Sequence, residues 1–318
     1  MKICAACHAN LPKESYSKKQ WKLDEYQRRC KVCTSNNREV RPPPQHDNND
    51  SNTNEVIKAL DSMHLKNIEE KISDEELFKQ PPPKEDCPIC FLRLPTLDTG
   101  WRYMSCCGKV ICSGCIHAPV YDNQGNEVDN KKCPFCRSAT PDTNEETIER
   151  EKKRMEVNDP IAISKQGIYY RDGTSGYPQD YGKALDLFYQ ASELGHATAY
   201  ANIGYAYDNG EGVEVDTKKG VYYYERAAMM GNETARYNLG VIEESAGNID
   251  RAIKHYMIST RSGDPDSLKE IKELYSNGHA TKEDYTKALR TYQTYLGEIK
   301  SRQRDEAAAA DHDYYRYY

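Results

Sequence analysis

Cysteine spacing constrains this chain more than any other feature of its sequence. All 12 cysteines lie before residue 137. Cys106 and Cys107 are adjacent, and the others form five C-x-x-C pairs: Cys4/Cys7, Cys30/Cys33, Cys87/Cys90, Cys112/Cys115 and Cys133/Cys136. A C-x-x-C turn can bring two thiolates onto one tetrahedral zinc ion. At about four thiolates per ion, the cysteines predict three Zn2+ ions with none left over.

Composition favours several small units over one thick core. The chain has 318 residues, of which 30% are charged, and its mean hydropathy is -0.91. No apolar run is long enough to span a bilayer, and the N-terminus lacks the apolar region of a signal peptide. We therefore expect a soluble cytoplasmic or nuclear protein that is not secreted and makes no membrane contact. In that reducing setting, paired cysteines indicate metal binding before disulfides.

The first two pairs predict a separate zinc-binding module over residues 1–40, with Cys4, Cys7, Cys30 and Cys33 as ligands; free or redox-active cysteines are the alternative. Between Lys13 and Arg41, basic residues outnumber acidic ones. The stretch that runs from Cys4-Ala-Ala-Cys7 through Leu11-Pro12 and Ser17-Lys18-Lys19-Gln20 to Cys30-Lys-Val-Cys33 resembles the LIM-like zinc domain of a fungal heterochromatin linker protein. The net charge of -6 argues against nucleic-acid binding by the whole chain. A chromatin or nucleic-acid contact through this basic module remains an alternative hypothesis.

The other eight cysteines resemble the ligand series of a RING-type zinc finger in an all-cysteine form, over residues 84–140. The resemblance implies a cross-brace with two zinc ions. One would be held by Cys87, Cys90, Cys112 and Cys115, and the other by Cys106, Cys107, Cys133 and Cys136. The usual family histidine position is occupied by Lys109. Two alternatives stay open: His117 pairs with Cys107 and leaves Cys106 free, or the module is a PHD-like treble clef.

The RING resemblance also implies a function and its contact residues. RING modules carry no catalytic nucleophile; they hold a ubiquitin-charged conjugating enzyme and favour ubiquitin transfer. Three residues match family contact positions for that enzyme and ubiquitin: Ile89, Pro134 and Arg137. The alternatives are local packing for Ile89 and a solvated charge for Arg137. The segment from Ile116 to Lys132 lacks the Trp that many active members have.

Three segments connect or end the modules. Residues 41–83 predict a flexible linker with a marginal helix at about 55–72, ending in prolines that stiffen the entry to residue 84. Residues 141–157 predict a connecting helix capped by Asp142 or Thr143. Residues 301–318 predict a tail that extends the last helix through Ala310 and then frays.

Residues 158–300 repeat themselves. The string Gly167-Ile-Tyr-Tyr-Arg-Asp-Gly173 is echoed by Gly204-Tyr-Ala-Tyr-Asp-Asn-Gly210. These units resemble Sel-like repeats, relatives of tetratricopeptide repeats, and imply four helix hairpins stacked into an all-α solenoid. We expect most of their tyrosines to pack in the core: Tyr169, Tyr170, Tyr200, Tyr205, Tyr207 and Tyr222 to Tyr224.

The resulting fold class is multidomain: small zinc-stabilised α+β modules followed by an all-α solenoid. The leading hypothesis is a RING-type ubiquitin ligase, whose partners are a ubiquitin-conjugating enzyme, ubiquitin and a protein or peptide substrate on the repeats. The alternative from another class is a non-catalytic zinc-binding scaffold for protein–protein interaction.

Overall fold

The computed structural model describes residues 2–3, 10–11, 72–82, 84–121, 124, 127–128, 132–310 and 317. The chain divides into two compact units, Met1–Ser51 and Asn52–Tyr318. In the first, strands β1 (Lys2–Ile3) and β2 (Asn10–Leu11) pair antiparallel. The predicted N-terminal zinc ligands and the marginal helix at 55–72 lie outside the described residues.

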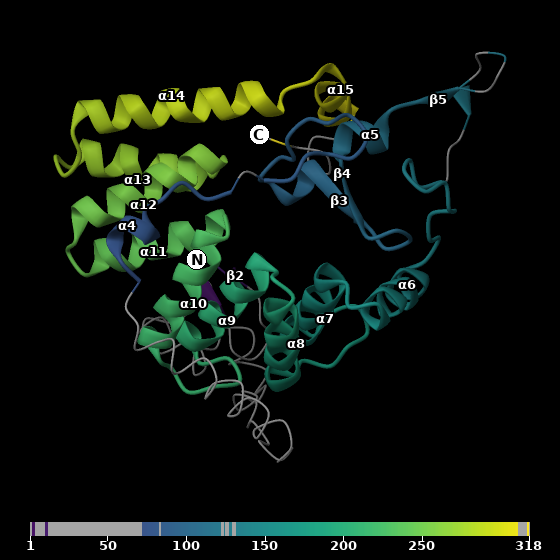
Figure 1. The fold of residues 1–318 in the computed structure, drawn as a ribbon, viewed down its shortest axis with the longest axis horizontal. Helices are drawn as coiled ribbons and strands as arrows, with labels where there is room; N and C mark the ends of the chain where they lie inside the picture. Colours follow the sequence, from purple (N-terminus) through teal and green to yellow (C-terminus); the bar gives the residue numbers. More distant parts are fainter. Residues whose placement is uncertain are drawn as a thin grey trace. The chain divides into compact units, whose positions relative to one another are not determined.

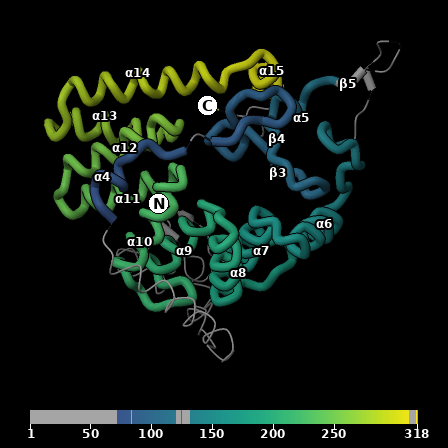
Figure 2. The backbone as a smooth tube through the Cα atoms, viewed as in Figure 1, coloured from purple at the N-terminus to yellow at the C-terminus, as the bar shows by residue number. Residues whose placement is uncertain are grey.

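The second unit begins with a small α+β module and continues with helices (Figures 1 and 2). Helix α4 (Asp74–Leu77) precedes this module. The module itself contains η2 (Asp98–Gly100), β3 (Trp101–Met104), β4 (Lys109–Cys112), α5 (Ser113–His117), β5 (Val120–Tyr121) and β6 (Glu127–Val128). The helices that follow are α6 (Asn144–Glu156), α7 (Pro160–Asp172), α8 (Tyr181–Glu193), α9 (Ala197–Asn209), α10 (Thr217–Met229), α11 (Glu233–Ser245), α12 (Ile249–Ser262), α13 (Pro265–Ser276), α14 (Lys282–Ile299) and α15 (Arg302–Ala310). Among the described residues, no helix is long and apolar enough to cross a membrane.

Helices α7 to α14 form the predicted all-helical solenoid. They pair as hairpins α7–α8, α9–α10, α11–α12 and α13–α14, and each hairpin packs against the next. Local sequence sets where they begin. Asp159 and Asp264 each accept hydrogen bonds from the first turn of a helix that starts with proline, which satisfies donors that have no partner within the helix.

The recurring glycine explains how tightly each hairpin closes. A Cβ at Gly167 would lie 2.6 Å from Phe188, and one at Gly204 would lie 2.8 Å from Tyr224. Gly240 meets the ring of Tyr256 in the same way. In three successive hairpins, an aromatic ring of the second helix therefore occupies the space that a side chain on the first would need.

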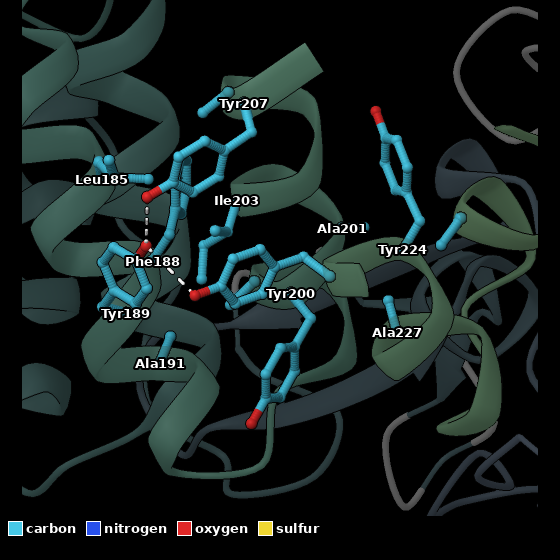
Figure 3. Packing of buried hydrophobic residues seen from close by; sticks show 14 of the residues in the cluster. Leu185, Phe188, Tyr189, Ala191, Tyr200, Ala201, Ile203, Tyr207, Tyr224 and Ala227 are labelled. Atoms are coloured by element: carbon cyan, nitrogen blue, oxygen red, sulfur yellow. Dashed lines mark hydrogen bonds between the residues drawn. The ribbon is translucent and has the colours of Figure 1, made fainter. Parts of the chain in front are cut away.

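Tyrosines fill much of the core between the first two hairpins (Figure 3). The hydroxyl of Tyr189 lies 3.1 Å from that of Tyr207 and 3.4 Å from that of Tyr223, so the buried hydroxyls satisfy one another. The expected burial holds for Tyr200, Tyr207 and Tyr222 to Tyr224, whereas Tyr169 and Tyr170 are half-buried. Tyr205 is an exception to the expected packing, since it is 41% exposed on the solvent side of α9.

The end of the predicted flexible linker is packed on the repeats. Leu77 is 1% exposed, and the ring of Phe78 lies 4.7 Å from that of His255 on α12. The guanidinium of Arg236 donates a 2.8 Å hydrogen bond to the carbonyl of Leu77. Because residues 41–83 are polar overall, their composition does not indicate that Leu77 and Phe78 pack on the repeats.

Two expectations for the helical ends have different outcomes. Thr143 caps α6, as predicted, by accepting from the backbone of Glu146. The last helix is not extended through Ala310, because Lys300 adopts an extended conformation and ends α14. A separate helix, α15, then turns back onto α5.

Candidate metal centre

Two groups of four cysteines lie in the α+β module. The first contains Cys87, Cys90, Cys112 and Cys115, and the sulfurs all lie within 4.8 Å of one another. Cys112 ends β4 and caps α5, which carries Cys115 one turn later. The start of a short helix thus holds one cysteine pair against the turn that holds the other.

The second group contains Cys106, Cys107, Cys133 and Cys136, with its sulfurs within the same 4.8 Å limit. Cys106 and Cys107 sit in the turn between β3 and β4, where the backbone N–H groups of Cys107 and Gly108 donate to the carbonyl of Met104. The order along the chain interleaves the two groups, so each one joins segments that are distant in sequence.

Two turns in the module have the same backbone design. In one, Cys87 N–H donates to the Leu92 carbonyl and Phe91 N–H donates to the Cys87 carbonyl. In the other, Cys133 N–H donates to the Ser138 carbonyl and Arg137 N–H donates to the Cys133 carbonyl. Phe91 and Arg137 have φ values of 58° and 64°, a left-handed conformation that costs a non-glycine residue about 1 kcal/mol or more. The closed turn, which points both sulfurs inward, offsets that cost.

The sulfur geometry fits a tetrahedral metal ion. Zinc–sulfur bonds of about 2.3 Å at the tetrahedral angle place two sulfurs about 3.8 Å apart, whereas a disulfide requires about 2 Å. The structure gives 3.7 Å for Cys90–Cys112, 3.9 Å for Cys107–Cys133 and 3.4 Å for Cys136–Cys106. All eight cysteines are free thiols. The two groups can each hold a metal ion.

Burial disfavours the charged thiolate form of two cysteines in the second group. It raises the pKa of the Cys106 thiol and raises that of Cys107 to about 11. Without a cation, these thiols would keep their protons near neutral pH. A bound metal ion removes that penalty, because it stabilises the thiolate form directly.

The structure brings together the cysteines that the RING resemblance groups. Cys106 lies with Cys107 in the second group, and His117 belongs to neither group; its side chain is exposed on α5. Of the predicted contact residues, Ile89 is 36% exposed, Arg137 is exposed and Pro134 is half-buried.

Sequence analysis missed two exposed aromatic side chains in the same turns. Phe91 follows Cys90 and is 76% exposed, and Phe135 precedes Cys136 and is 44% exposed. The sequence offered a signal, because each of these aromatic residues is adjacent to a cysteine of a C-x-x-C pair. Together with Ile89, they give the two turns an apolar outer surface.

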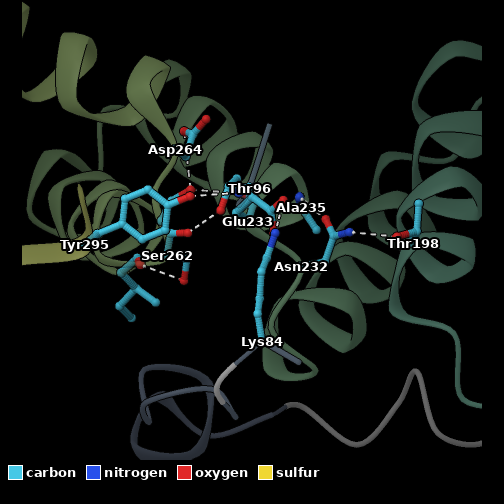
Figure 4. Close-up of polar contacts among 11 residues, drawn as sticks. Lys84, Thr96, Thr198, Asn232, Glu233, Ala235, Ser262, Asp264 and Tyr295 are labelled. Atoms are coloured by element: carbon cyan, nitrogen blue, oxygen red, sulfur yellow. Dashed lines mark hydrogen bonds and ion pairs between the residues drawn. The ribbon is translucent and has the colours of Figure 1, made fainter. Parts of the chain in front are cut away.

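The module contacts the last hairpins of the solenoid through polar groups (Figure 4). Thr96 N–H lies 2.7 Å from the hydroxyl of Tyr295, and its own hydroxyl donates to the carbonyl of Ser262. Lys84 forms a 2.8 Å ion pair with Glu233. The partners come from α11, α12 and α14, so one edge of the module spans three repeat helices.

The first hairpin is joined to the other edge of the module. Tyr103 on β3 donates a 2.9 Å hydrogen bond to Asp159, which caps α7. Arg154 on α6 donates to the same carboxylate oxygen from two nitrogens, at 2.9 and 2.8 Å. Asp159 is only 7% exposed, so its charge is matched by the guanidinium and by the helix start. The module therefore bridges the first and the last hairpins of the solenoid.

A buried arginine connects the C-terminal helix to the first cysteine group. Arg304 on α15 is 0% exposed and donates to the carbonyls of Arg93 and Ile299 at 2.9 and 2.6 Å. Its other terminal nitrogen lies 3.9 Å from Sγ of Cys90. A Cβ at Gly114 would lie 2.7 Å from the backbone nitrogen of Arg304, so the glycine on α5 permits this close approach.

Comparison with known proteins identifies the repeats. The family model for the Sel1 repeat matches residues 161–196, 197–232 and 273–292. Among solved structures, a Sel1 repeat protein from Oxalobacter formigenes is 30% identical, with a TM-score of 0.43, and the alignment covers 55% of this chain and 68% of that one.

Two curated relatives match shorter stretches. Chitin synthase regulatory factor 3 of Schizosaccharomyces pombe is 28% identical over 120 residues, or 36% of this chain and 13% of that protein. The ERAD-associated E3 ubiquitin-protein ligase component HRD3B of Arabidopsis thaliana is 29% identical over 103 residues, or 32% of this chain and 16% of that protein. The chain thus spans less than a fifth of the length of either relative. The helical solenoid of this chain contains Sel1 repeats.

Proposed function

We propose that this protein is a zinc-dependent, RING-type ubiquitin ligase whose Sel1 repeats bind the protein to be modified. The observation that carries the proposal is the interleaved pair of four-cysteine groups, with Ile89, Phe91 and Phe135 exposed on the two cysteine turns. Zinc would supply folding free energy to the module and no chemistry of its own. Transfer would occur on the bound conjugating enzyme, so the module needs no nucleophile.

Two further residues have assigned roles in this proposal. Pro134 would pack beside Ile89 against the conjugating enzyme, and the exposed Arg137 would donate to that enzyme and to ubiquitin. The planar guanidinium suits this task because its fork can serve two acceptors at once. The turn conformation of Arg137, with φ of 64°, fixes the direction in which its side chain leaves the module.

One relative supports a link with ubiquitin. HRD3B is named as a component of an E3 ubiquitin-protein ligase. By analogy, Sel1 repeats in the present chain would serve as the recognition arm of a ligase, with the RING-type module on the same polypeptide.

The test is a self-ubiquitylation assay of the full chain with a panel of conjugating enzymes. We expect chain formation by the wild type, and a strong loss for Ile89→Ala and Arg137→Ala. Arg226→Ala is the matched control, because Arg226 is an exposed arginine on α10, outside the module. Absence of product with every conjugating enzyme would leave the second candidate.

That second candidate is a zinc-stabilised scaffold without ligase activity. It is favoured by the sequence from Ile116 to Lys132, which lacks the Trp found in many active RING modules. The docking of the module on both ends of the repeats would then be its main purpose. A scaffold retains binding to its partners when Ile89 is changed to Ala, whereas a ligase loses turnover.

A further inference from the structure

A groove of about 860 Å3 lies between α12, α14 and the segment from Phe78 to Arg93. Its volume is in the range of pockets that bind ligands. Apolar side chains form part of its wall, including Pro81, Ile253 and Met257. Arg93, which lies just after the first cysteine turn, also lines it. The groove therefore runs directly beside the metal-binding module.

Positive charge is concentrated in this groove. Six cations line it against three acids, although the chain as a whole has 44 basic and 50 acidic residues. The cations are Lys84, Arg93, Lys254, Arg261, Lys287 and Arg290, and the acids are Asp86, Asp284 and Glu298. The groove thus carries the charge opposite to that of the whole protein.

Three of these six cations already have a partner within the folded chain. Lys84 pairs with Glu233, and Arg93 pairs with Glu298 at 2.6 Å. Lys254 lies over the ring of Phe78, 5.3 Å from its centre. Two of the three acids are likewise engaged, since Asp284 accepts from Thr281 in a capping box.

The other three cations are Arg261, Lys287 and Arg290. Within the part of the chain that the structure describes, they have neither an ion pair nor a side-chain hydrogen bond, and all three are exposed. Lys287 and Arg290 are three residues apart on α14, so they lie on one face of that helix. Like charges at this spacing destabilise a helix slightly. Fold stability therefore gives no reason to place them together.

We infer that this groove binds an acidic, extended peptide segment of a partner protein. Carboxylates along the segment would pair with Arg261, Lys287 and Arg290, while apolar side chains between them would contact the wall at Ile253 and Met257. A nucleic acid fits less well, because its uniform phosphate charge would meet the acids in the groove and leave the apolar wall unused. Binding at this groove would be one form of the recognition role proposed above for the repeats. It rests on that proposed function only for the biological role of the bound segment.

The experiment is fluorescence anisotropy with the full chain and a short fluorescein-labelled peptide in which Glu alternates with Leu. A second peptide with Gln in place of every Glu removes the charge and keeps the shape. We expect saturable binding of the Glu peptide that weakens as salt rises, and little binding of the Gln peptide. In the double variant Lys287→Glu/Arg290→Glu, affinity for the Glu peptide should fall about tenfold or more.

Lys218→Glu is the matched control, because Lys218 is an exposed lysine on α10 away from the groove. Circular dichroism of each variant checks that the exposed substitutions leave the helices intact. Equal binding of both peptides, an unaffected double variant, or displacement by single-stranded DNA at lower concentration than by unlabelled Glu peptide would overturn the inference. Because this assay contains no ubiquitin, its failure is distinct from a failure of the ligase proposal.

Discussion

The guanidinium of Arg304 faces the sulfur of Cys90 at 3.9 Å, although the two residues are 214 positions apart in the chain. The terminal nitrogens of this fully buried side chain also donate to the backbone carbonyls of Arg93, Ile299 and Leu92. A buried guanidinium needs a compensating negative charge. Four thiolates around one divalent ion carry a net charge of about -2, so the first cysteine group would supply that charge. The C-terminal helix is in this way part of the metal centre's surroundings.

Changing Arg304→Met should loosen the first cysteine group. We expect faster loss of zinc to a chelator and a decrease in the free energy of unfolding of about 3 kcal/mol, because the carbonyls of Arg93 and Ile299 lose their donor. The measurements are zinc release to a chromogenic chelator and denaturant titration. Arg302→Met is the control, because the Arg302 side chain is 92% exposed and pairs only within α15. Equal zinc release from both variants would show that Arg304 acts on the fold alone.

Native mass spectrometry of the full chain should show three zinc ions, two of them in residues 84–140. Cys106→Ser should lower the count to two, because it removes a ligand from the second group. His117→Ala should leave it at three. The opposite pattern, a lower count for His117→Ala and an unchanged count for Cys106→Ser, would establish His117 as a ligand.

Removing the Arg236 side chain should release α4 from the repeats. Arg236 is 1% exposed and donates to the carbonyls of Leu77 and Ala228 at 2.8 and 3.0 Å. Burial lowers its pKa to about 10. We expect Arg236→Met to increase protease cleavage between residues 72 and 82 and to cost about 2 kcal/mol of stability.

The control for this change is Arg226→Met on the exposed face of α10. If both variants are cleaved alike, residues 72–82 are held by Leu77 and Phe78 and the hydrogen bond to Arg236 adds nothing.

His255 should make the protein less stable as the pH falls from neutral. It is 0% exposed, and burial together with the nearby Arg236 and Arg251 lowers its pKa from 6.5 to about 3. Below pH 6.5, His255 binds a proton in the unfolded chain but stays neutral in the folded protein. The free energy of unfolding therefore falls by up to about 1.4 kcal/mol per pH unit, down to the folded pKa. Above 6.5 its contribution no longer changes.

Denaturant titrations between pH 5 and 7 can measure this effect. Zinc ligands also contribute acid sensitivity, so the quantity to compare is the difference between wild type and His255→Gln. We expect that difference to change by about 2 kcal/mol over this range. A difference that stays constant with pH would mean that His255 is protonated in the folded protein or that its site admits water.

Local sequence was sufficient to predict structure wherever a short motif specifies its own conformation. The caps at Asp159 and Asp264 were predictable because a side chain there satisfies donors a few residues away. The recurring glycines and tyrosines also carried the resemblance to Sel-like repeats, which implied stacked helix hairpins. The spacing of the eight cysteines between 87 and 136 indicated metal binding, since a C-x-x-C turn already brings two sulfurs together.

Only the tertiary structure decided which distant residues meet. Nothing near Arg304 in sequence indicates that it lies against Cys90, and the polar linker gave no sign that Leu77 is buried or that Phe78 contacts His255 on α12. The charges of Arg261, Lys287 and Arg290 appear as ordinary surface residues until the hairpins align them along one groove. The physical reason is that caps and ligand turns are stabilised by neighbours within a few residues. Docking and grooves depend on how the hairpins stack, which is set by packing summed over the whole array.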